Sequence, residues 1–329
     1  MAAAKRVTLK TIADVTGLAI ATVSRALKGD LAIKEETRLR VQQAAIDVGY
    51  VPNNVGMRLR AGRSFTLAAV LPIQPDLAGY CASLTNAIAT ELHGTPFDLN
   101  ICLYHPDDNA LERLADIVDS HSADGIFLNG IKQEDHRVRY LLDKEFPFVT
   151  HGRSKWSERH DYFAYDNYAF GEKAVNCLVD RKRTNIQIVS PPLDQRCGAD
   201  MLAGAQSAAR ARTIQFSVMP GVDGSCRTDE IATAVNTALS GENCADALIL
   251  ASNNALFGTL RAIEERGLRI GQDLDVYFKD THGLVQWIPR KVMVEREDLE
   301  AAGVELAKML LARIETPDLP LMHVVKALG

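Results

Sequence analysis

The 329-residue sequence lacks the motifs that mark most metalloenzymes, hydrolases and nucleotide-binding enzymes. Its eight histidines form no H-x-x-x-H pair, and its six cysteines form no C-x-x-C pair. It has neither a G-x-S-x-G turn nor a P-loop. No apolar run reaches the roughly 18 residues of a membrane-spanning helix, and no secretory h-region follows Met1. We therefore expect a cytoplasmic protein with reduced cysteines that has no metal, no cofactor, no membrane contact and no enzymatic activity.

Charge is distributed unevenly along the chain. Residues 1–64 contain eleven lysine and arginine residues against five acidic residues, a net charge of +6. The remaining 265 residues contain 26 basic and 37 acidic residues, a net charge of −11. A small basic module therefore precedes a large acidic one, and a basic module suits a polyanionic partner.

The basic module contains the pattern of three short helices. Thr8 is a good N-cap for the first helix, and Gly17 ends that helix. A second helix is predicted over residues 22–28, and a third over residues 34–48. A turn of about three or four residues that contains a glycine joins the first two helices, as in a helix-turn-helix. A purely structural three-helix bundle is the alternative.

The side chains of the second helix favour DNA binding over the plain bundle. Thr22, Ser24 and Lys28 can contact phosphates. The guanidinium of Arg25 can pair with the O6 and N7 atoms of guanine.

The module also resembles the headpiece of the lactose-repressor/galactose-repressor (LacI/GalR) family. The resemblance is carried by residues 7–14, 22–27 and 48–53, which include the T-V-S-R and G-Y-x-P-N signatures. It implies that the second helix lies in the major groove and that Arg25 reads a guanine.

Three residues at the start of that helix make this an unusual reader of DNA. The family usually has a capping serine where this chain has Ala19, and loss of such a cap costs about 1 kcal/mol of helix stability. Ile20 and Ala21 stand where the family varies with operator sequence, and neither side chain can form hydrogen bonds. Readout should therefore depend on Arg25 and on apolar contacts with thymine methyl groups.

Residues 53–64 follow as a basic segment around Leu59. In isolation this segment is typical of a flexible linker, because Gly56 disfavours a helix. The family resemblance instead implies a hinge helix on DNA, with Leu59 wedged into the minor groove and nearby arginines on phosphates. The predicted DNA contacts are Thr8, Ile20, Ala21, Thr22, Ser24, Arg25, Lys28, Asn53, Leu59 and Arg60.

In the rest of the chain, short apolar runs alternate with helical patterns, which predicts parallel sheets with helices on both faces. The expected strands are 67–71, 98–103, 125–128, 146–150, 186–190, 247–251 and 275–278, and the expected helices are 80–92, 111–120, 169–179, 199–210, 230–239 and 256–265. About 265 residues suit two such lobes. The A-D-G-I run at 123–126, the D-N-x-x-x-G pattern at 166–171 and the segment 261–270 resemble the effector-binding core of the same family.

The predicted fold is an all-α helix-turn-helix headpiece plus an α/β core of two doubly wound parallel-sheet lobes, of the periplasmic-binding-protein-like type. The expected domains are a headpiece at 1–52, a hinge helix at 53–64 and an effector-binding and dimerisation core at 65–329. Within the core we expect a first lobe of about 65–163 and 293–318, and a second lobe of about 164–292 and 319–329.

Ligands of open α/β sheets bind beyond the carboxyl ends of the strands, here in a cleft between lobes. This rule points to residues just after the strands, among them Asp76, Tyr104 and His105, although any one of them can equally be an ordinary loop residue. The predicted effector contacts are Gln74, Tyr80, His151, Arg153, Arg196, Asn253 and Asp280. Such mixed polar groups suit a polyhydroxyl ligand. Met201 stands where many sugar-binding members of the family have an arginine, and Arg196 is positioned to compensate.

The sequence thus predicts a homodimeric repressor of sugar-uptake or sugar-catabolism genes. Its expected partners are a pseudo-palindromic double-stranded operator and a mono- or disaccharide that releases the DNA. By resemblance, the helices after Gly79 and after Tyr104 form the dimer face of the first lobe. The alternatives are a regulator that uses a corepressor such as a purine, a sugar-binding protein without a DNA role, and an enzyme that acts on a sugar.

Overall fold

The computed structural model describes residues 7–27, 29–50, 62–73, 77–105, 108–241, 244–283, 287 and 291–329. The chain divides into two compact units, residues 1–63 and residues 64–329. Each unit is described by itself below. Within the described residues, no helix is both long enough and apolar enough to cross a membrane.

The described part of the first unit contains three helices, α1 (Leu9–Thr16), α2 (Ile20–Leu27) and α3 (Glu35–Asp47). Thr8 precedes α1 as its N-cap, and its backbone N–H donates to Oγ1 of Thr11 at 3.1 Å. Gly17 ends α1 with φ = 68°, a left-handed conformation that glycine adopts at low cost. The predicted helices are confirmed, and α2 begins at Ile20, earlier than the pattern indicated.

A small apolar core holds these helices together. It consists of Ile12, Ala13, Val23, Ala26, Val41, Ala44 and Ala45. Most of these side chains are short, so the three helices pack closely. Only Val23 and Ala26 of α2 lie in this core, and the opposite face of α2 is exposed.

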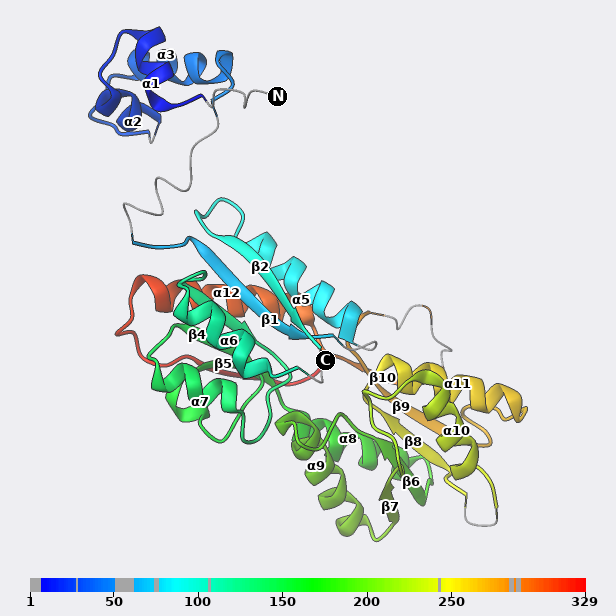
Figure 1. Cartoon of the computed structure of the whole chain (residues 1–329). Helices are drawn as coiled ribbons and strands as arrows, with labels where there is room; N and C mark the ends of the chain where they lie inside the picture. The colour runs from blue at the N-terminus through cyan, green and yellow to red at the C-terminus, as the bar shows by residue number, and fades with distance from the viewer. Residues whose placement is uncertain are drawn as a thin grey trace. The chain divides into compact units, whose positions relative to one another are not determined.

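The first lobe of the second unit is built on a parallel sheet with strand order β11-β5-β4-β3-β1-β2 (Figure 1). Its strands are β1 (Thr66–Pro72), β2 (Asp98–Tyr104), β3 (Gly125–Leu128), β4 (Phe148–His151), β5 (Asp161–Tyr165) and β11 (His323–Lys326). Its helices are α5 (Leu77–Glu91), α6 (Ala110–Asp119), α7 (His136–Asp143), the 3₁₀ turn η1 (Ser157–Arg159) and α12 (Leu299–Glu315).

The second lobe is built on a parallel sheet with strand order β10-β9-β8-β6-β7. Its strands are β6 (Asn185–Val189), β7 (Gln215–Val218), β8 (Ala247–Leu250), β9 (Asp275–Asp280) and β10 (Met293–Arg296). Its helices are α8 (Asn167–Asp180), α9 (Arg196–Arg212), α10 (Thr228–Ala238) and α11 (Asn253–Glu265).

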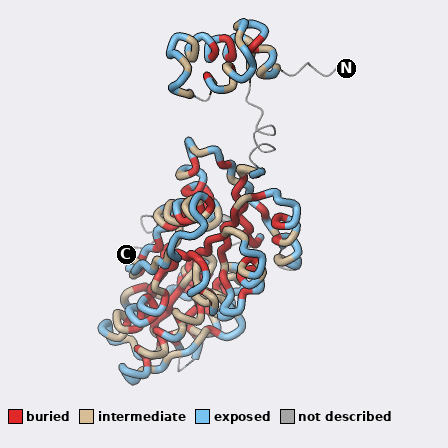
Figure 2. The backbone as a smooth tube through the Cα atoms, turned by 90° about the vertical axis from the view of Figure 1, so that its left-hand side faces the viewer, coloured by how far each residue is buried: buried red, intermediate tan, exposed pale blue. Residues whose placement is uncertain are grey.

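Helices cover both faces of each sheet. In the first lobe, Leu84 of α5 and Leu306 of α12 pack on one face, and Leu114 of α6 and Leu141 of α7 pack on the other. In the second lobe, α10 and α11 cover one face, and α8 and α9 cover the other. Buried backbone is accordingly concentrated inside the lobes, with exposed segments outside (Figure 2). The predicted doubly wound α/β core is confirmed.

The expected distribution of the C-terminal segments between the lobes was wrong. β11 pairs in parallel with β5 of the first sheet, although residues 319–329 were assigned to the second lobe. β10 pairs in parallel with β9 of the second sheet, although residues 293–318 were assigned to the first lobe. The rest of that segment, with helix α12, does pack in the first lobe as expected. Each of these strands has only four residues and lies at the edge of its sheet. Its local pattern therefore does not reveal which sheet it joins.

Two glycines explain the closest helix contact in the core, between α8 and α9. A Cβ atom at Gly171 would lie 2.1 Å from the carbonyl oxygen of Met201, and one at Gly204 would lie 2.0 Å from that of Tyr168. The glycines of the D-N-x-x-x-G and L-A-G patterns thus let two backbones touch. These glycines serve packing. Their contact holds α9 against α8, the helix that follows the first crossing between the lobes.

Candidate functional site

Helix α2 presents an exposed face opposite the apolar core of the headpiece. Ile20, Ala21 and Arg25 are exposed on it, and Thr22 and Ser24 are half-buried beside them. Val23 and Ala26 are buried and anchor the helix from the other side. Five of the predicted DNA contacts therefore share one surface.

Arg25 is held in place by an acidic neighbour. Its Nε donates to Oδ2 of Asp30 at 2.7 Å, and the Oδ1 atom of Asp30 accepts the backbone N–H of Ala32 at 2.9 Å. Among the described residues only Nε is engaged, so the two terminal nitrogens of Arg25 are available as a fork. Sequence reasoning missed Asp30, although an acid five residues after a key arginine was a usable signal.

Several predicted contacts fall outside the described residues. They are Lys28, Asn53, Leu59 and Arg60 for DNA, and Gln74 for the effector. Asp76, one of the residues indicated by the strand-end rule, also falls outside.

The second unit contains a cavity of about 130 Å³ between its two lobes. Its lining combines side chains from strand ends of the first lobe, such as His151 and Tyr165, with residues of the second lobe, such as Cys197 and Lys279. This position, at the carboxyl ends of parallel strands and next to the crossings between sheets, is where α/β proteins bind ligands.

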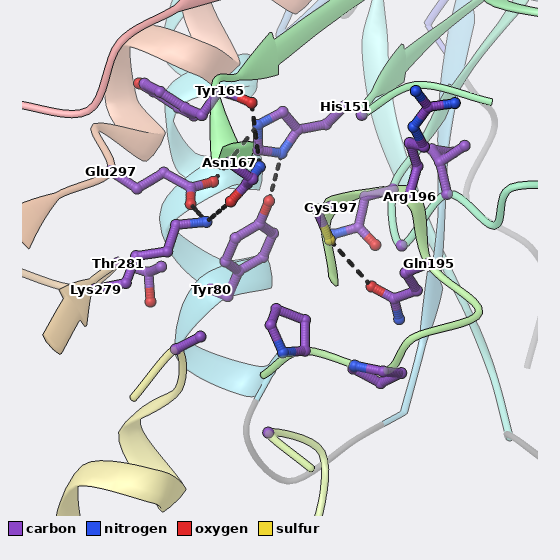
Figure 3. Close-up of a pocket in the computed structure, with 18 of the residues that line it drawn as sticks. Tyr80, His151, Tyr165, Asn167, Gln195, Arg196, Cys197, Lys279, Thr281 and Glu297 are labelled. Carbon is purple, nitrogen blue, oxygen red and sulfur yellow. Dashed lines mark hydrogen bonds and ion pairs between the residues drawn. The ribbon is translucent and has the colours of Figure 1, made fainter. Parts of the chain in front are cut away.

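A buried ion pair lies on one side of the cavity (Figure 3). The Nζ atom of Lys279 pairs with Oε2 of Glu297 and donates to Oδ1 of Asn167 at 2.8 Å. The side chains of Lys279 and Glu297 are only 7% and 6% exposed. Since Asn167 follows one crossing between the lobes and Glu297 lies in another, this pair ties the crossings to strand β9.

His151 and Tyr80 line the cavity beside the Lys279–Glu297 pair. The Tyr80 hydroxyl is hydrogen-bonded to Nδ1 of His151, and Nε2 of His151 lies 3.8 Å from Oε1 of Glu297. Burial lowers the pKa of His151 to about 4, despite the opposing effect of Glu297. Burial also raises the pKa of Tyr80 well above its usual value.

The protonation states follow from these shifts. Both groups are neutral near pH 7, and the carboxylate favours the His151 tautomer with its proton on Nε2. The Tyr80 hydroxyl then donates to Nδ1, and its oxygen faces the cavity as an acceptor.

Two arginines and one aspartate form a second polar group at the start of α9. Nη2 of Arg153 donates to Oδ2 of Asp200 at 2.8 Å, and Nε of Arg196 donates to Oδ1 of Asp200 at 2.7 Å. Asp200 thereby joins the loop after β4 of the first lobe to α9 of the second. In Figure 3, Arg196 and Cys197 lie across the cavity from the Lys279–Glu297 pair.

The lobes also meet through backbone hydrogen bonds at this side of the cavity. The N–H of Gln133 donates to the carbonyl of Asp194 at 2.9 Å, and the N–H of Arg196 donates to that of Ile131 at 3.1 Å. Elsewhere, α5 touches the second lobe, where a Cβ atom at Gly79 would lie 2.5 Å from the ring of His282. The structure thus holds the two lobes together around the cavity.

Comparison with known proteins agrees with both parts of the chain. Residues 8–53 match the family model "Bacterial regulatory proteins, lacI family". The chain is 28% identical over 318 residues to the HTH-type transcriptional regulator AglR of Rhizobium meliloti (strain 1021), covering 94% of this chain and 88% of that protein.

Solved structures share the fold. A complex of the transcriptional regulator CelR with cellobiose has a TM-score of 0.72 at 23% identity and covers 98% of both chains. A lac repressor dimer bound to operator and the anti-inducer ONPF has a TM-score of 0.85 at 19% identity, covering 99% of this chain and 97% of that one.

Residues 8–53 form a lacI-family DNA-binding domain, and the whole chain is similar to transcriptional regulators. It is a DNA-binding transcriptional regulator, as the helix-turn-helix pattern predicted. The predicted family resemblance is confirmed.

The cavity brings together four of the seven predicted effector residues, namely Tyr80, His151, Arg153 and Arg196. Asn253 and Asp280 do not line it. Nδ2 of Asn253 and Nδ1 of His282 lie 2.8 Å apart, and the fully buried Asp280 accepts the backbone N–H of His282 at 3.0 Å. Both therefore contact the lining residue His282, and direct contact of Asn253 and Asp280 with an effector stays a prediction.

Tyr104 is also a structural residue, because its hydroxyl accepts from Nη1 of the buried Arg137 at 3.1 Å.

Sequence reasoning missed most of the polar lining. The missed residues include Asn129, Asn167, Gln195, Asp200, Lys279, His282 and Glu297. One signal was present, since Lys279 is a lone cation in the otherwise largely apolar strand β9. Asn129, directly after an expected strand, and Asn167, in the D-N-x-x-x-G pattern, also carried a signal. Asp200 and Glu297 had none, because their closeness to the cavity depends on how the two lobes meet.

Met201 is fully buried in the apolar cluster between α8, α9 and the second sheet. Its side chain packs with that cluster, and Arg196, one turn earlier, lines the cavity instead. The cavity therefore has a guanidinium at Arg196 and none at position 201.

Proposed function

We propose that this regulator is a homodimeric repressor of sugar-uptake or sugar-catabolism genes, acting in the cytoplasm, which a mono- or disaccharide releases from its operator. The observation that carries the proposal is the polar cavity between two lobes, in a chain whose first unit is a lacI-family DNA-binding domain. A ligand there contacts both lobes at once, so its binding energy can shift their arrangement.

The lining chemistry supports a sugar. Each hydroxyl of a sugar needs both a donor and an acceptor when it is buried. Tyr80 offers an oriented acceptor, and the buried Oδ1 of Asn129 has no partner among the described residues. Arg153 and Arg196 offer donors. We propose that the chain binds this ligand without transforming it, in keeping with relatives that are transcriptional regulators.

An exposed edge strand supports the dimer. β2 is at one edge of the first sheet, and its Ile101 and Leu103 are 49% and 52% exposed. Apolar side chains on an unpaired edge favour association unless they are covered. The neighbouring helices α5 and α6 are those that the family resemblance assigns to the dimer face, so we propose that a second copy covers this edge.

A ligand screen followed by DNA binding tests this function. Full-length protein is first used to select its operator from random duplex DNA, and is then screened by thermal shift against sugars and purines. We expect a sugar to raise the melting temperature, because it binds only the folded state, and to weaken operator binding. A purine that tightens operator binding, or a stabilising sugar that leaves operator affinity unchanged, would contradict the proposal.

Leu59→Ala tests the proposed hinge wedge, whose residue lies outside the described part of the chain. We expect operator affinity to fall at least about tenfold, since the lost wedge no longer stabilises bent DNA. Affinity for random duplex should change much less, because it depends on phosphate contacts. Fluorescence anisotropy on both duplexes measures this, and equal losses on the two would show that Leu59 is no wedge.

A further inference from the structure

The group formed by Arg153, Arg196 and Asp200 has more donors than its own hydrogen bonds use. Asp200 receives one N–H from each arginine, on separate oxygens. Nη1 and Nη2 of Arg196, and Nε and Nη1 of Arg153, make no hydrogen bond within the described residues. The three side chains are 28%, 40% and 16% exposed for Arg153, Arg196 and Asp200, so they are only partly solvated.

The charge around the cavity does not balance. Among its described lining residues, Lys279 is neutralised by Glu297, while Asp200 faces both Arg153 and Arg196. His151 and His282 add no charge near pH 7, because burial lowers the pKa of each imidazole. One positive charge is therefore left at the α9 side of the cavity. Holding a charge in a partly buried place without a counter-ion is unfavourable.

The position of Arg196 adds to this excess. It is the first residue of the 17-residue helix α9, whose N-terminal end carries a partial positive charge. Anions are favoured at such an end and cations are disfavoured. Gln195 offers no side-chain cap, and Arg196 and Cys197 of the first turn both line the cavity. Apart from its ion pair with Asp200, an arginine is therefore unfavourable at this end of the helix.

We propose that Arg196 and Arg153 select an effector with an anionic group, a sugar acid whose carboxylate sits between the two guanidinium groups. This rests on the function proposed above and specifies its ligand class. A carboxylate accepts two N–H donors of a guanidinium at once, and its single charge matches the single excess charge. A sugar phosphate shares this oxyanion chemistry, and the experiment distinguishes the two.

The test compares sugars that differ only in the acidic group. D-Glucuronate and D-galacturonate are titrated against D-glucose, D-galactose and the corresponding 6-phosphates, using full-length protein and calorimetry. We expect at least one uronate to bind about tenfold or more tightly than its parent sugar, as charge-assisted hydrogen bonds imply. If a 6-phosphate bound more tightly than any uronate, the two arginines would still form an oxyanion site, and its ligand would be a sugar phosphate.

Arg196→Met is the decisive variant, and Arg210→Met is its control. Both remove one arginine from α9, and Arg210 is an exposed residue far along the helix that does not line the cavity. Arg196→Met should abolish the preference for the acid over its parent sugar, and Arg210→Met should leave it unchanged. A preference that survives Arg196→Met would overturn the proposal.

A purely structural role for Arg196 gives a different result without any ligand. If it only braces Asp200, Arg196→Met should lower the melting temperature of the free protein by several degrees. If Arg196 instead serves to bind an anion, the melting temperature of the free protein should stay the same or rise. The substitution removes the excess charge, and Arg153 still pairs with Asp200. A clear drop, together with unchanged sugar binding, would contradict the inference.

The two proposals fail in different ways. Neutral sugars that bind as tightly as their acids and still release operator DNA would refute the anionic effector and keep the sugar-responsive repressor. No response of operator binding to any sugar or sugar acid would refute both.

Discussion

Arg25→Ala is expected to weaken operator binding by about tenfold to hundredfold, while binding to random DNA changes little. A guanidinium that pairs with the edge of guanine contributes about 1–3 kcal/mol of discrimination, whereas non-specific affinity comes from the summed phosphate contacts. Ile20 and Ala21 offer no hydrogen bonds, so no neighbour at the start of α2 can take over this role. The Nε contact with Asp30 fixes the arginine and leaves its terminal nitrogens free for the base.

Lys10→Ala is the matched control. Lys10 is an exposed cation on α1, so its removal changes the headpiece charge by the same amount. We expect it to affect operator and random DNA equally and only slightly. Anisotropy titrations of both variants, at two salt concentrations, make the comparison. If Arg25→Ala lost equal affinity for both duplexes, Arg25 would be a phosphate contact.

Glu297→Gln is expected to be the most destabilising single change in the core. It leaves the Lys279 ammonium, which is 7% exposed, without its carboxylate. Removing one partner of a buried ion pair typically costs about 3–5 kcal/mol. For a unit of this size, each kcal/mol lowers the melting temperature by about 2–4 °C, so we expect a fall of about 10 °C.

An exposed pair provides the control for this prediction. Lys144 and Asp119 lie 3.1 Å apart with side chains 47% and 61% exposed. Asp119→Asn makes the same acid-to-amide change, and such surface pairs contribute at most about 1 kcal/mol. Adding Lys279→Met to Glu297→Gln should restore much of the loss, because no buried charge is left. Similar melting temperatures for Glu297→Gln and Asp119→Asn would show that the buried pair is dispensable.

The headpiece could be predicted almost completely because its determinants are local. Thr8, Gly17 and the apolar positions of three short helices lie within about 50 consecutive residues, and each acts on its own turn or its neighbour. The core architecture also followed from a local property, the alternation of apolar strands with amphipathic helices. Most inner strands were found because they are largely apolar, although β5 (Asp161–Tyr165), which is also an inner strand, was missed.

Edge strands and the C-terminal region were harder to predict from the sequence, for a physical reason. β7 and β11 are short and have no fully buried residue, so they lack the apolar run that marks an inner strand. Which sheet β10 and β11 join depends on pairing with β9 and β5, whose residues are far away in the sequence. The lobe assignment of β10 and β11 failed for this reason, whereas α12 lies in the first lobe as expected.

The residues that line the cavity likewise divide into those that local sequence indicated and those that it did not. Placement after a strand end indicated His151 and Arg153, because the carboxyl ends of parallel strands meet at one edge. It did not indicate Glu297 beside Lys279, or Arg153 beside Asp200, since those contacts join residues that are more than ten positions apart in the sequence.

What the sequence by itself determined is therefore what local chemistry dictates, namely the absence of common catalytic and metal motifs, the basic headpiece and the α/β alternation. What only the tertiary structure decided is which distant charges meet. It pairs Lys279 with Glu297 and leaves an excess positive charge beside α9, because charge balance in a cavity depends on distances that no sequence spacing fixes.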